Sequence, residues 1–206
     1  MSDFMRFLEG DTGLGKSSLL GTAMIPYWKQ AGGFTTQRKY HREQGMRFVL
    51  VPLHATAHPM VQRKDGTVAA FLTSHAGVAQ FIPQPFEAAA AWLQTDLAQG
   101  IRLFLLDEVG GLEMTCPDFV RALFAVLDSD AICVGIFKSQ KNSESLLSRV
   151  SLSEEQMALY QQNRSHLQRR IQERGQFLSV TANNRSQVRQ EIDAFLHQNS
   201  GAPLSF

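Results

Sequence analysis

The chain has 206 residues, which is enough for one domain with a well-buried core. Its formal net charge is +1, so the total charge does not indicate binding to nucleic acid or to an anionic membrane. No apolar run approaches the ~20 residues that a membrane span requires, and no signal peptide precedes the first predicted strand. We therefore expect a cytoplasmic protein.

The first predicted element is a short strand over Phe4–Leu8, which leads into a glycine-rich loop. Residues 10–17 read Gly-Asp-Thr-Gly-Leu-Gly-Lys-Ser and fit the phosphate-loop (Walker A, P-loop) pattern G-x-x-x-x-G-K-[ST]. The glycines let successive N–H groups turn toward a phosphate, and the N-terminus of a helix predicted over Ser17–Trp28 adds partial positive charge. We therefore predict a nucleotide site in which Lys16 acts on the β- and γ-phosphates and Ser17 binds Mg²⁺. The predicted nucleotide-binding residues of the loop are Gly10, Asp11, Thr12, Gly13, Leu14, Gly15, Lys16, Ser17 and Ser18.

Two acidic residues stand beside this loop. Glu9 and Asp11 bring carboxylates close to the expected position of a phosphate. Since like charges repel, we expect both residues to oppose phosphate binding.

The segment after the loop predicts a β-hairpin. Pro26 is expected to bend or end the helix, and Gly32-Gly33 to act as a stop. Two extended stretches follow, Phe34–Tyr40 and Arg47–Leu53, separated by a polar segment that contains glycine. A third strand is predicted over Val68–Thr73. His54 and His58 lie between prolines and are interpreted as loop histidines without a role.

The second acidic motif follows a buried strand. An alanine-rich helix is predicted over Phe86–Gln99, and the apolar run Ile101–Leu106 is typical of a strand buried on both faces of a parallel sheet. This run ends in Asp107-Glu108, a Walker B type of strand end. We predict that Asp107 holds Mg²⁺ through a water, because a phosphate loop holds the metal from both sides. Glu108 is placed to orient or deprotonate an attacking water, which favours hydrolysis.

The remaining elements complete an α/β fold. A helix is predicted over Pro117–Leu127 and a buried strand over Ala131–Phe137, which we expect to lie between the two motif strands. The predicted architecture is the three-layer P-loop NTPase fold. It has a mostly parallel central sheet, a Walker B strand separated from the P-loop strand, and an antiparallel hairpin extension. Cys116 and Cys133 lack metal-ligand spacing and are interpreted as reduced, packed thiols.

A polar, helical insertion is predicted over residues 138–176, inside a single domain that spans 1–206. It carries seven Lys or Arg residues against four Glu residues. A helix pair packed on the domain edge is the favoured interpretation, and a lid or a surface for a protein partner stays open. A strand over Phe177–Thr181 and a helix over Ser186–His197 close the chain.

With these motifs in hand, the chain resembles the small P-loop nucleoside-triphosphatases of the cancer-related nucleoside-triphosphatase group. The matching segments are Gly33–Arg38 with Gly45–Phe48, Gly77–Phe81 with Phe86-Glu87, Asp107–Met114, and Thr181–Arg185. The resemblance implies Mg²⁺-dependent hydrolysis of nucleoside triphosphates such as ATP and GTP, with loose base selectivity.

The resemblance also implies roles for residues outside the two phosphate motifs. It places Asn184 and Arg185 beside the base and sugar, and Glu113 as a brace for the acidic strand end. Arg38 and Arg47 lie in matched segments. They are candidate catalytic arginines that would complete the positive charge around the γ-phosphate.

Two other functions stay open at this point. A nucleotide-regulated binding protein would order residues 138–176 or the hairpin for a partner, although a pure switch has little use for Glu108. A nucleotide or small-molecule kinase would use the same phosphate cradle together with an arginine-rich lid. The arginines available for such a lid are Arg164, Arg169, Arg170 and Arg174.

Overall fold

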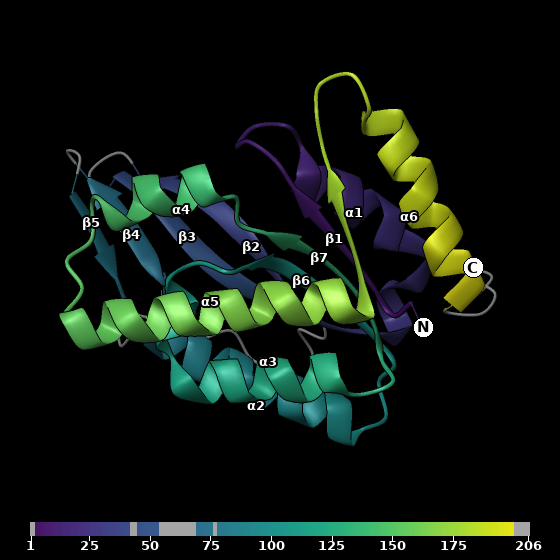
Figure 1. Cartoon of the computed structure of the whole chain (residues 1–206), viewed down its shortest axis with the longest axis horizontal. Helices are drawn as coiled ribbons and strands as arrows, with labels where there is room; N and C mark the ends of the chain where they lie inside the picture. The colour runs from purple at the N-terminus through teal and green to yellow at the C-terminus, as the bar shows by residue number, and fades with distance from the viewer. Residues whose placement is uncertain (1–2, 42–44, 54–68, 76–77, 200–206) are drawn as a thin grey trace.

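The computed structural model describes residues 3–41, 45–53, 69–75 and 78–199. Within these residues one sheet has the strand order β5-β4-β3-β2-β6-β7-β1-β8 (Figure 1). The strands are β1 (Met5–Glu9), β2 (Ala31–His41), β3 (Gly45–Pro52), β4 (Leu72–His75), β5 (Val78–Phe81), β6 (Leu103–Val109), β7 (Ile132–Phe137) and β8 (Gly175–Ser179). Strands β2, β6, β7, β1 and β8 pair in parallel, whereas β2 to β5 pair antiparallel and form an extension.

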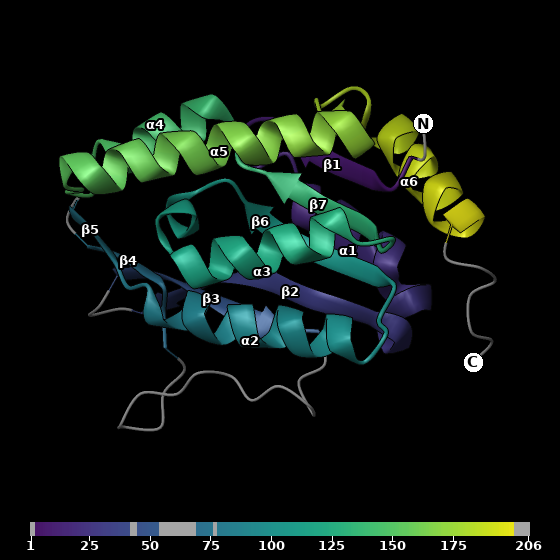
Figure 2. The same ribbon diagram turned by 60° about the horizontal axis from the view of Figure 1, so that its bottom comes forward.

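Helices cover both faces of this sheet. They are α1 (Lys16–Met24), the 3-10 helix η1 (Ile25–Gln30), α2 (Gln84–Ala98), the 3-10 helix η2 (Leu112–Thr115), α3 (Pro117–Asp128), α4 (Gln140–Leu147), α5 (Glu154–Arg174) and α6 (Arg185–Asn199). Helices α1 and α6 share one hydrophobic cluster with the sheet, and α2, α3 and α5 share another. Figure 2 shows α5, α3 and α2 side by side on their face. The expected three-layer α/β architecture is therefore confirmed.

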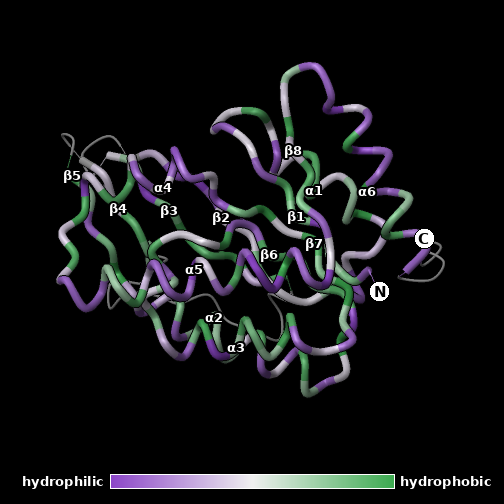
Figure 3. The backbone as a smooth tube through the Cα atoms, viewed as in Figure 1, coloured by the Kyte–Doolittle hydropathy of each residue, from purple (hydrophilic) through white to green (hydrophobic). Residues whose placement is uncertain are grey.

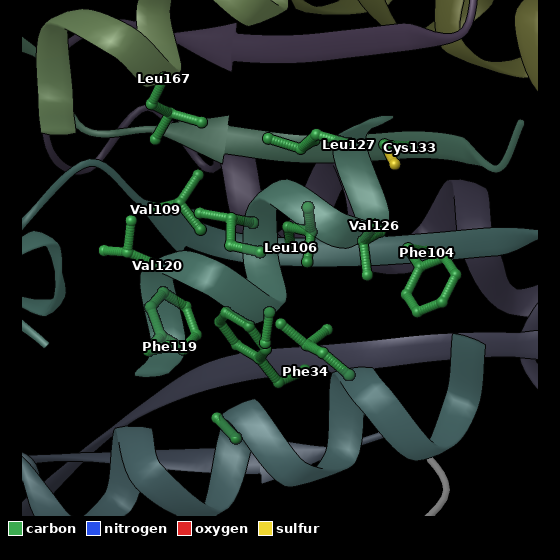
Figure 4. Packing of buried hydrophobic residues seen from close by; sticks show 14 of the residues in the cluster. Phe34, Phe104, Leu106, Val109, Phe119, Val120, Val126, Leu127, Cys133 and Leu167 are labelled. Carbon is green, nitrogen blue, oxygen red and sulfur yellow. The ribbon is translucent and has the colours of Figure 1, made fainter. Parts of the chain in front are cut away.

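The main core lies between the sheet and helices α2, α3 and α5. Phe34 and Phe119 pack with ring centroids 5.8 Å apart, and Leu106 of β6 is fully buried in the same cluster (Figure 4). Every residue of β7 is buried, and this strand is hydrophobic apart from one glycine (Figure 3). A strand covered on both faces requires such a continuous apolar run, which is why the sequence identified it.

The order of the parallel strands agrees with the expectation from the acidic motif. Strand β7 pairs in parallel with β1 on one side and with β6 on the other. The P-loop strand and the Walker B strand are thus separated by one strand. Because parallel strands end at the same edge, the residues after β1, β6 and β7 meet there.

The helical segment ends at Gln30, just before the predicted stop at Gly32-Gly33, but the following strand begins at Ala31 and not at Phe34. Both glycines lie inside β2, where Gly32 pairs with Phe104 and Gly33 with Leu105. Gly33 has φ +97°, and a Cβ on it would lie 2.2 Å from the Leu105 carbonyl oxygen. Its N–H donates to a carboxylate oxygen of the buried Asp96, at 3.0 Å. These glycines allow β2 to approach β6 and α2 closely.

The insertion was expected to pack on the edge of the domain. This expectation is wrong for its longer helix, α5. Tyr160, Leu167 and Ile171 of α5 are buried in the main core, and α5 contacts β1, β8 and α3. Since α5 connects β7 to the parallel strand β8, it lies over the face of the sheet as a crossover helix. Figure 3 shows that many of its other residues are hydrophilic.

Several smaller expectations can be compared with the structure. The α-helix after the loop ends at Met24, before Pro26, and continues as η1. Cys116 and Cys133 are free and buried, and burial raises the pKa of each thiol to about 12. His54 and His58 lie outside the described residues. None of the described helices has the length and apolar character needed to cross a membrane.

We predict that Gly33→Ala destabilises the fold by more than about 2 kcal/mol, because the positive φ and the close Leu105 carbonyl both oppose a Cβ. Gly21→Ala in α1 is the matched control. A Cβ there meets nothing within 4 Å, so this variant should be neutral or more stable by up to about 1 kcal/mol. Urea unfolding of both variants measures the difference, and equal midpoints would contradict the strain assigned to Gly33.

Candidate functional site

The phosphate loop connects β1 to α1 at the carboxyl edge of the parallel strands. Lys16 is the first residue of α1, and its Nζ donates to the carbonyl oxygens of Gly10 and Asp11, both at 2.8 Å. Burial lowers the pKa of Lys16, while the charges of Glu108, Asp107 and Asp11 oppose that shift. The ammonium group thus lies inside the curve of the loop, where a phosphate would be bound.

The other predicted loop residues divide into two groups. Leu14 packs against the hydrophobic cluster on the α1 side of the sheet, so its side chain supports the loop. A Cβ on Gly10 would lie 2.6 Å from the Val180 carbonyl oxygen, so this glycine allows the loop to contact the chain after β8. The loop residues that line a cavity at this edge are Thr12, Gly13, Gly15, Lys16, Ser17 and Ser18.

Ser17 and Asp107 meet across the two phosphate motifs. The Ser17 hydroxyl donates to Asp107 Oδ1 at 3.2 Å. A hydroxyl and a carboxylate are hard oxygen ligands of the kind that Mg²⁺ prefers. Among the described residues no group of three or more His, Cys, Asp or Glu side chains could hold a metal. The donor set therefore fits a magnesium ion that is shared with phosphate oxygens and water.

The acidic strand end is buried and carries closely spaced charges. Asp107 is 3% exposed, and burial together with the charge of Glu108 raises its pKa to about 7. The hydrogen bond from Ser17 and the charges of Lys138 and Lys16 oppose this shift. Glu108 itself forms an ion pair with Lys138, the first residue after β7. The adjacent strand thus supplies a cation that positions the Glu108 carboxylate.

The glycine pair after β6 is closely packed. Gly110 has φ +87°, and a Cβ on it would lie 2.8 Å from the Phe137 ring. Gly111 donates its N–H to Glu113 Oε1 at 2.7 Å, and burial raises the pKa of this glutamic acid. This contact agrees with the bracing role that the resemblance implies for Glu113.

Arg164 of α5 connects the ends of β6 and β7. Its guanidinium donates to the carbonyl oxygen of Gly110 and, at 2.6 Å, to that of Lys138. The same group stacks 4.3 Å from the centroid of the Phe137 ring. Arg164 is buried, so it supports the site from behind and does not form part of an exposed lid.

Asn184 and Arg185 lie on the opposite flank of the phosphate loop, after β8. The side-chain oxygen of Asn184 accepts from the Thr181 N–H at 2.8 Å, which stabilises the turn before α6. A Cβ on Gly15 would lie 2.8 Å from a guanidinium nitrogen of Arg185. This contact puts Arg185 against the phosphate loop.

The two candidate catalytic arginines point to opposite faces of the extension. Arg38 lies on the face of β2 that lines the cavity, and its guanidinium stacks 5.5 Å from the Phe48 ring centroid. Arg47 stands between Met46 and Phe48, both of which line the same cavity. Because successive residues of a strand alternate, Arg47 faces the other way. The structure brings Arg38 to the site and does not bring Arg47.

Helix α4 lies over one side of the cavity and contributes residues to its lining. At one end Lys141 lies 3.4 Å from the Asp11 carboxylate, and both side chains are largely exposed. At the other end the Arg149 carbonyl accepts from the Ala79 N–H of β5 at 3.3 Å. A cavity of about 730 Å³ lies between α4, the phosphate loop and the extension. Asp11, expected to oppose phosphate binding, therefore has a basic partner.

Sequence reasoning missed Lys138 and Lys141 as parts of the site, and it considered Arg164 only as an arginine of a lid. A signal for Lys138 was available, because it directly follows a strand predicted to lie between the two motif strands. Lys141 and Arg164 had no such signal, since each contacts the site only through the packing of its helix.

Comparisons with known proteins agree with this geometry. The profile of a protein family described as NTPase matches residues 6–172, most of the chain. The crystal structure of THEP1 from the hyperthermophile Aquifex aeolicus superposes with a TM-score of 0.58 at 18% identity, covering 93% of this chain and 98% of that chain. No curated protein sequence matches this chain. The structural match shows the fold, and the family match shows that the chain belongs to this family of P-loop NTPases.

Proposed function

We propose that the protein hydrolyses nucleoside triphosphates, such as ATP and GTP, to the diphosphate and phosphate in a Mg²⁺-dependent reaction. The observation that supports this proposal most directly is the meeting of Lys16, the Ser17–Asp107 pair and Glu108 at one edge of the sheet. A triphosphate held by the loop would have its γ-phosphate beside the Glu108 carboxylate.

Each residue has a separate role in this proposal. Lys16 exchanges its loop carbonyls for β- and γ-phosphate oxygens when the triphosphate binds. Ser17 and Asp107 would hold Mg²⁺, which shields the charge of the phosphates and of the leaving diphosphate. Glu108, positioned by Lys138, orients water for attack on the γ-phosphorus and accepts its proton. Asn184 and Arg185 contact the nucleoside side of the bound molecule.

Glu108 also favours hydrolysis over a function as a nucleotide-dependent switch. A switch protein requires only binding, whereas this site holds a partly exposed carboxylate next to the metal-binding residue. Helix α4 lines the cavity beside these residues with Asn142, Ser145 and Leu146.

We predict that Lys16→Ala abolishes triphosphate hydrolysis and strongly weakens triphosphate binding. The change removes the only cation of the loop, whose interaction with the γ-phosphate grows as charge develops. Phosphate release and titration with a fluorescent ATP analogue measure the two effects, with thermal melting as the control for folding. Normal turnover by a folded variant would contradict the assignment of the phosphate loop.

We predict that Glu108→Gln lowers kcat by roughly 10²-fold or more, the usual contribution of a general base. Binding of Mg·ATP should persist, because Asp107, Ser17 and Lys16 are unchanged. Glu155→Gln, an exposed substitution in the first turn of α5, is the matched control and should retain full activity. A Glu108→Gln variant that hydrolyses at the normal rate would favour the switch function.

We predict that Arg38→Ala lowers kcat by about tenfold or more, equivalent to ~1.4 kcal/mol of barrier, with little change in affinity for the triphosphate. Arg47→Ala is the matched control, because this arginine belongs to the same hairpin but to its other face. Steady-state kinetics of both variants test the difference. Equal effects of the two substitutions would exclude a specific role for Arg38 at the γ-phosphate.

A further inference from the structure

Lys138 is a second cation beside the phosphate loop, and it comes from a different strand than Lys16. It directly follows β7, which lies between the P-loop strand β1 and the Walker B strand β6. Leu8 of β1 pairs with Ile136 of β7. Continued by two residues, this register brings Lys138 level with Gly10, the first glycine of the loop. Since neighbouring strands lie about 4.8 Å apart, the Lys138 side chain begins beside the place where the loop would hold a phosphate.

The backbone of Lys138 is fixed on two sides. Its N–H donates to the Val109 carbonyl oxygen at 2.8 Å, and its own carbonyl oxygen accepts from the Arg164 guanidinium at 2.6 Å. A Cβ on Gly111 would lie 2.9 Å from Lys138 Cε, so the glycine leaves room for the lysine stem. The side chain is 21% exposed and lines the same cavity as Lys16. The ammonium group is thus presented to the cavity from a fixed base.

The hydrogen-bonding capacity of this ammonium is only partly used. A lysine has three N–H donors, and among the described residues Lys138 donates from its side chain only to Glu108. Burial and, with a smaller effect, the charge of Lys138 lower the pKa of Lys16, so the two ammonium groups lie close enough to repel each other. A phosphate group between them would relieve this repulsion and would accept the unused donors.

The ion pair with Glu108 also bears on phosphate binding. A carboxylate that acts on water beside a γ-phosphate repels the charge of that phosphate. A lysine that contacts both groups offsets this repulsion and keeps the carboxylate next to the phosphorus that water attacks. A diphosphate has no γ-phosphate, so it would leave the remaining donors of Lys138 without this acceptor.

We propose that Lys138 binds the γ-phosphate directly and makes the site selective for triphosphates over diphosphates. Its ammonium keeps the ion pair with Glu108 and donates a further hydrogen bond to a γ-phosphate oxygen. This proposal deepens the proposed function and rests on it, because it adds a second cation to the triphosphate that Lys16 holds. The contact makes Lys138 a catalytic residue, since it stabilises charge on the phosphoryl group during attack.

The experiment measures the triphosphate preference, which is the dissociation constant of ADP divided by that of AMP-PNP, a non-hydrolysable ATP analogue, both with Mg²⁺. Calorimetry gives these constants for Lys138→Met, which removes the charge, and for Lys138→Arg, which keeps it. Lys39→Met is the matched control. Lys39 is exposed on β2 and follows Arg38, which lines the cavity, so it faces the other side of the strand. Thermal melting checks that each variant is folded.

We expect Lys138→Met to lower the triphosphate preference about tenfold or more, because a charge-assisted hydrogen bond to the γ-phosphate is lost. Lys138→Arg should retain most of the preference, and Lys39→Met should leave it unchanged. The comparison is repeated in a Glu108→Gln background, where no unpaired carboxylate remains to repel the phosphate. Lys138→Met should lower the preference there as well. An unchanged preference in that background would mean that the lysine acts only through Glu108, and would overturn the contact.

Phosphate release from ATP by the unchanged protein tests hydrolysis separately. A triphosphate preference that depends on Lys138, without phosphate release, would contradict hydrolysis and support the contact. Hydrolysis by the unchanged protein, together with a full preference in Lys138→Met, would overturn the contact and leave hydrolysis in place. An unchanged protein that does not prefer AMP-PNP to ADP would also overturn the contact.

Discussion

The parallel pairing of β7 with both β1 and β6 is the constraint on which the site depends. This register aligns Leu8 with Ile136 and Asp107 with Ile136, so the carboxyl ends of the two motif strands stand one strand apart. At this spacing the Ser17 hydroxyl donates to Asp107, and Lys138 pairs with Glu108.

Burial makes the charges of this edge interdependent. Asp107 is nearly inaccessible, and its raised pKa shows that a buried carboxylate is not fully compensated by protein groups alone. Lys16 is likewise partly desolvated, and burial shifts its pKa downward. A triphosphate with its magnesium ion would bring both an anion for Lys16 and a cation for Asp107. The charges of this edge therefore suit a ligand that carries both an anion and a cation.

The insertion after β7 performs two structural tasks with its two helices. Helix α5 is part of the core and holds the ends of β6 and β7 together through Arg164. Helix α4 contributes little to the main core and spans the space between the phosphate loop and β5. Its exposed contact at Lys141 is the kind of ion pair that contributes about 0–1 kcal/mol, so this pair adds little to the stability of the helix position.

The sequence by itself determined the phosphate loop, the acidic strand end and the place of β7 between the two motif strands. The first two features follow from local patterns, because glycine spacing and a buried apolar run each act within a few neighbouring residues. The place of β7 follows from an analogy instead, since Asp-Glu strand ends are usual in the branch of phosphate-loop folds in which another strand separates the two motif strands. Only the tertiary structure decided which partners the site residues have. The contacts of Lys138 with Glu108, Arg164 with Gly110 and Lys141 with Asp11 join residues 30, 54 and 130 positions apart.

The limit of local patterns also explains why the sequence did not assign Gly33 to the strand and could not choose between Arg38 and Arg47. A glycine pair reads locally as a stop, and only the approach of Asp96 and Leu105 shows why the strand requires it. Arg38 and Arg47 are equivalent in sequence, but strand register assigns them to opposite faces, and register is set by pairing across the whole sheet.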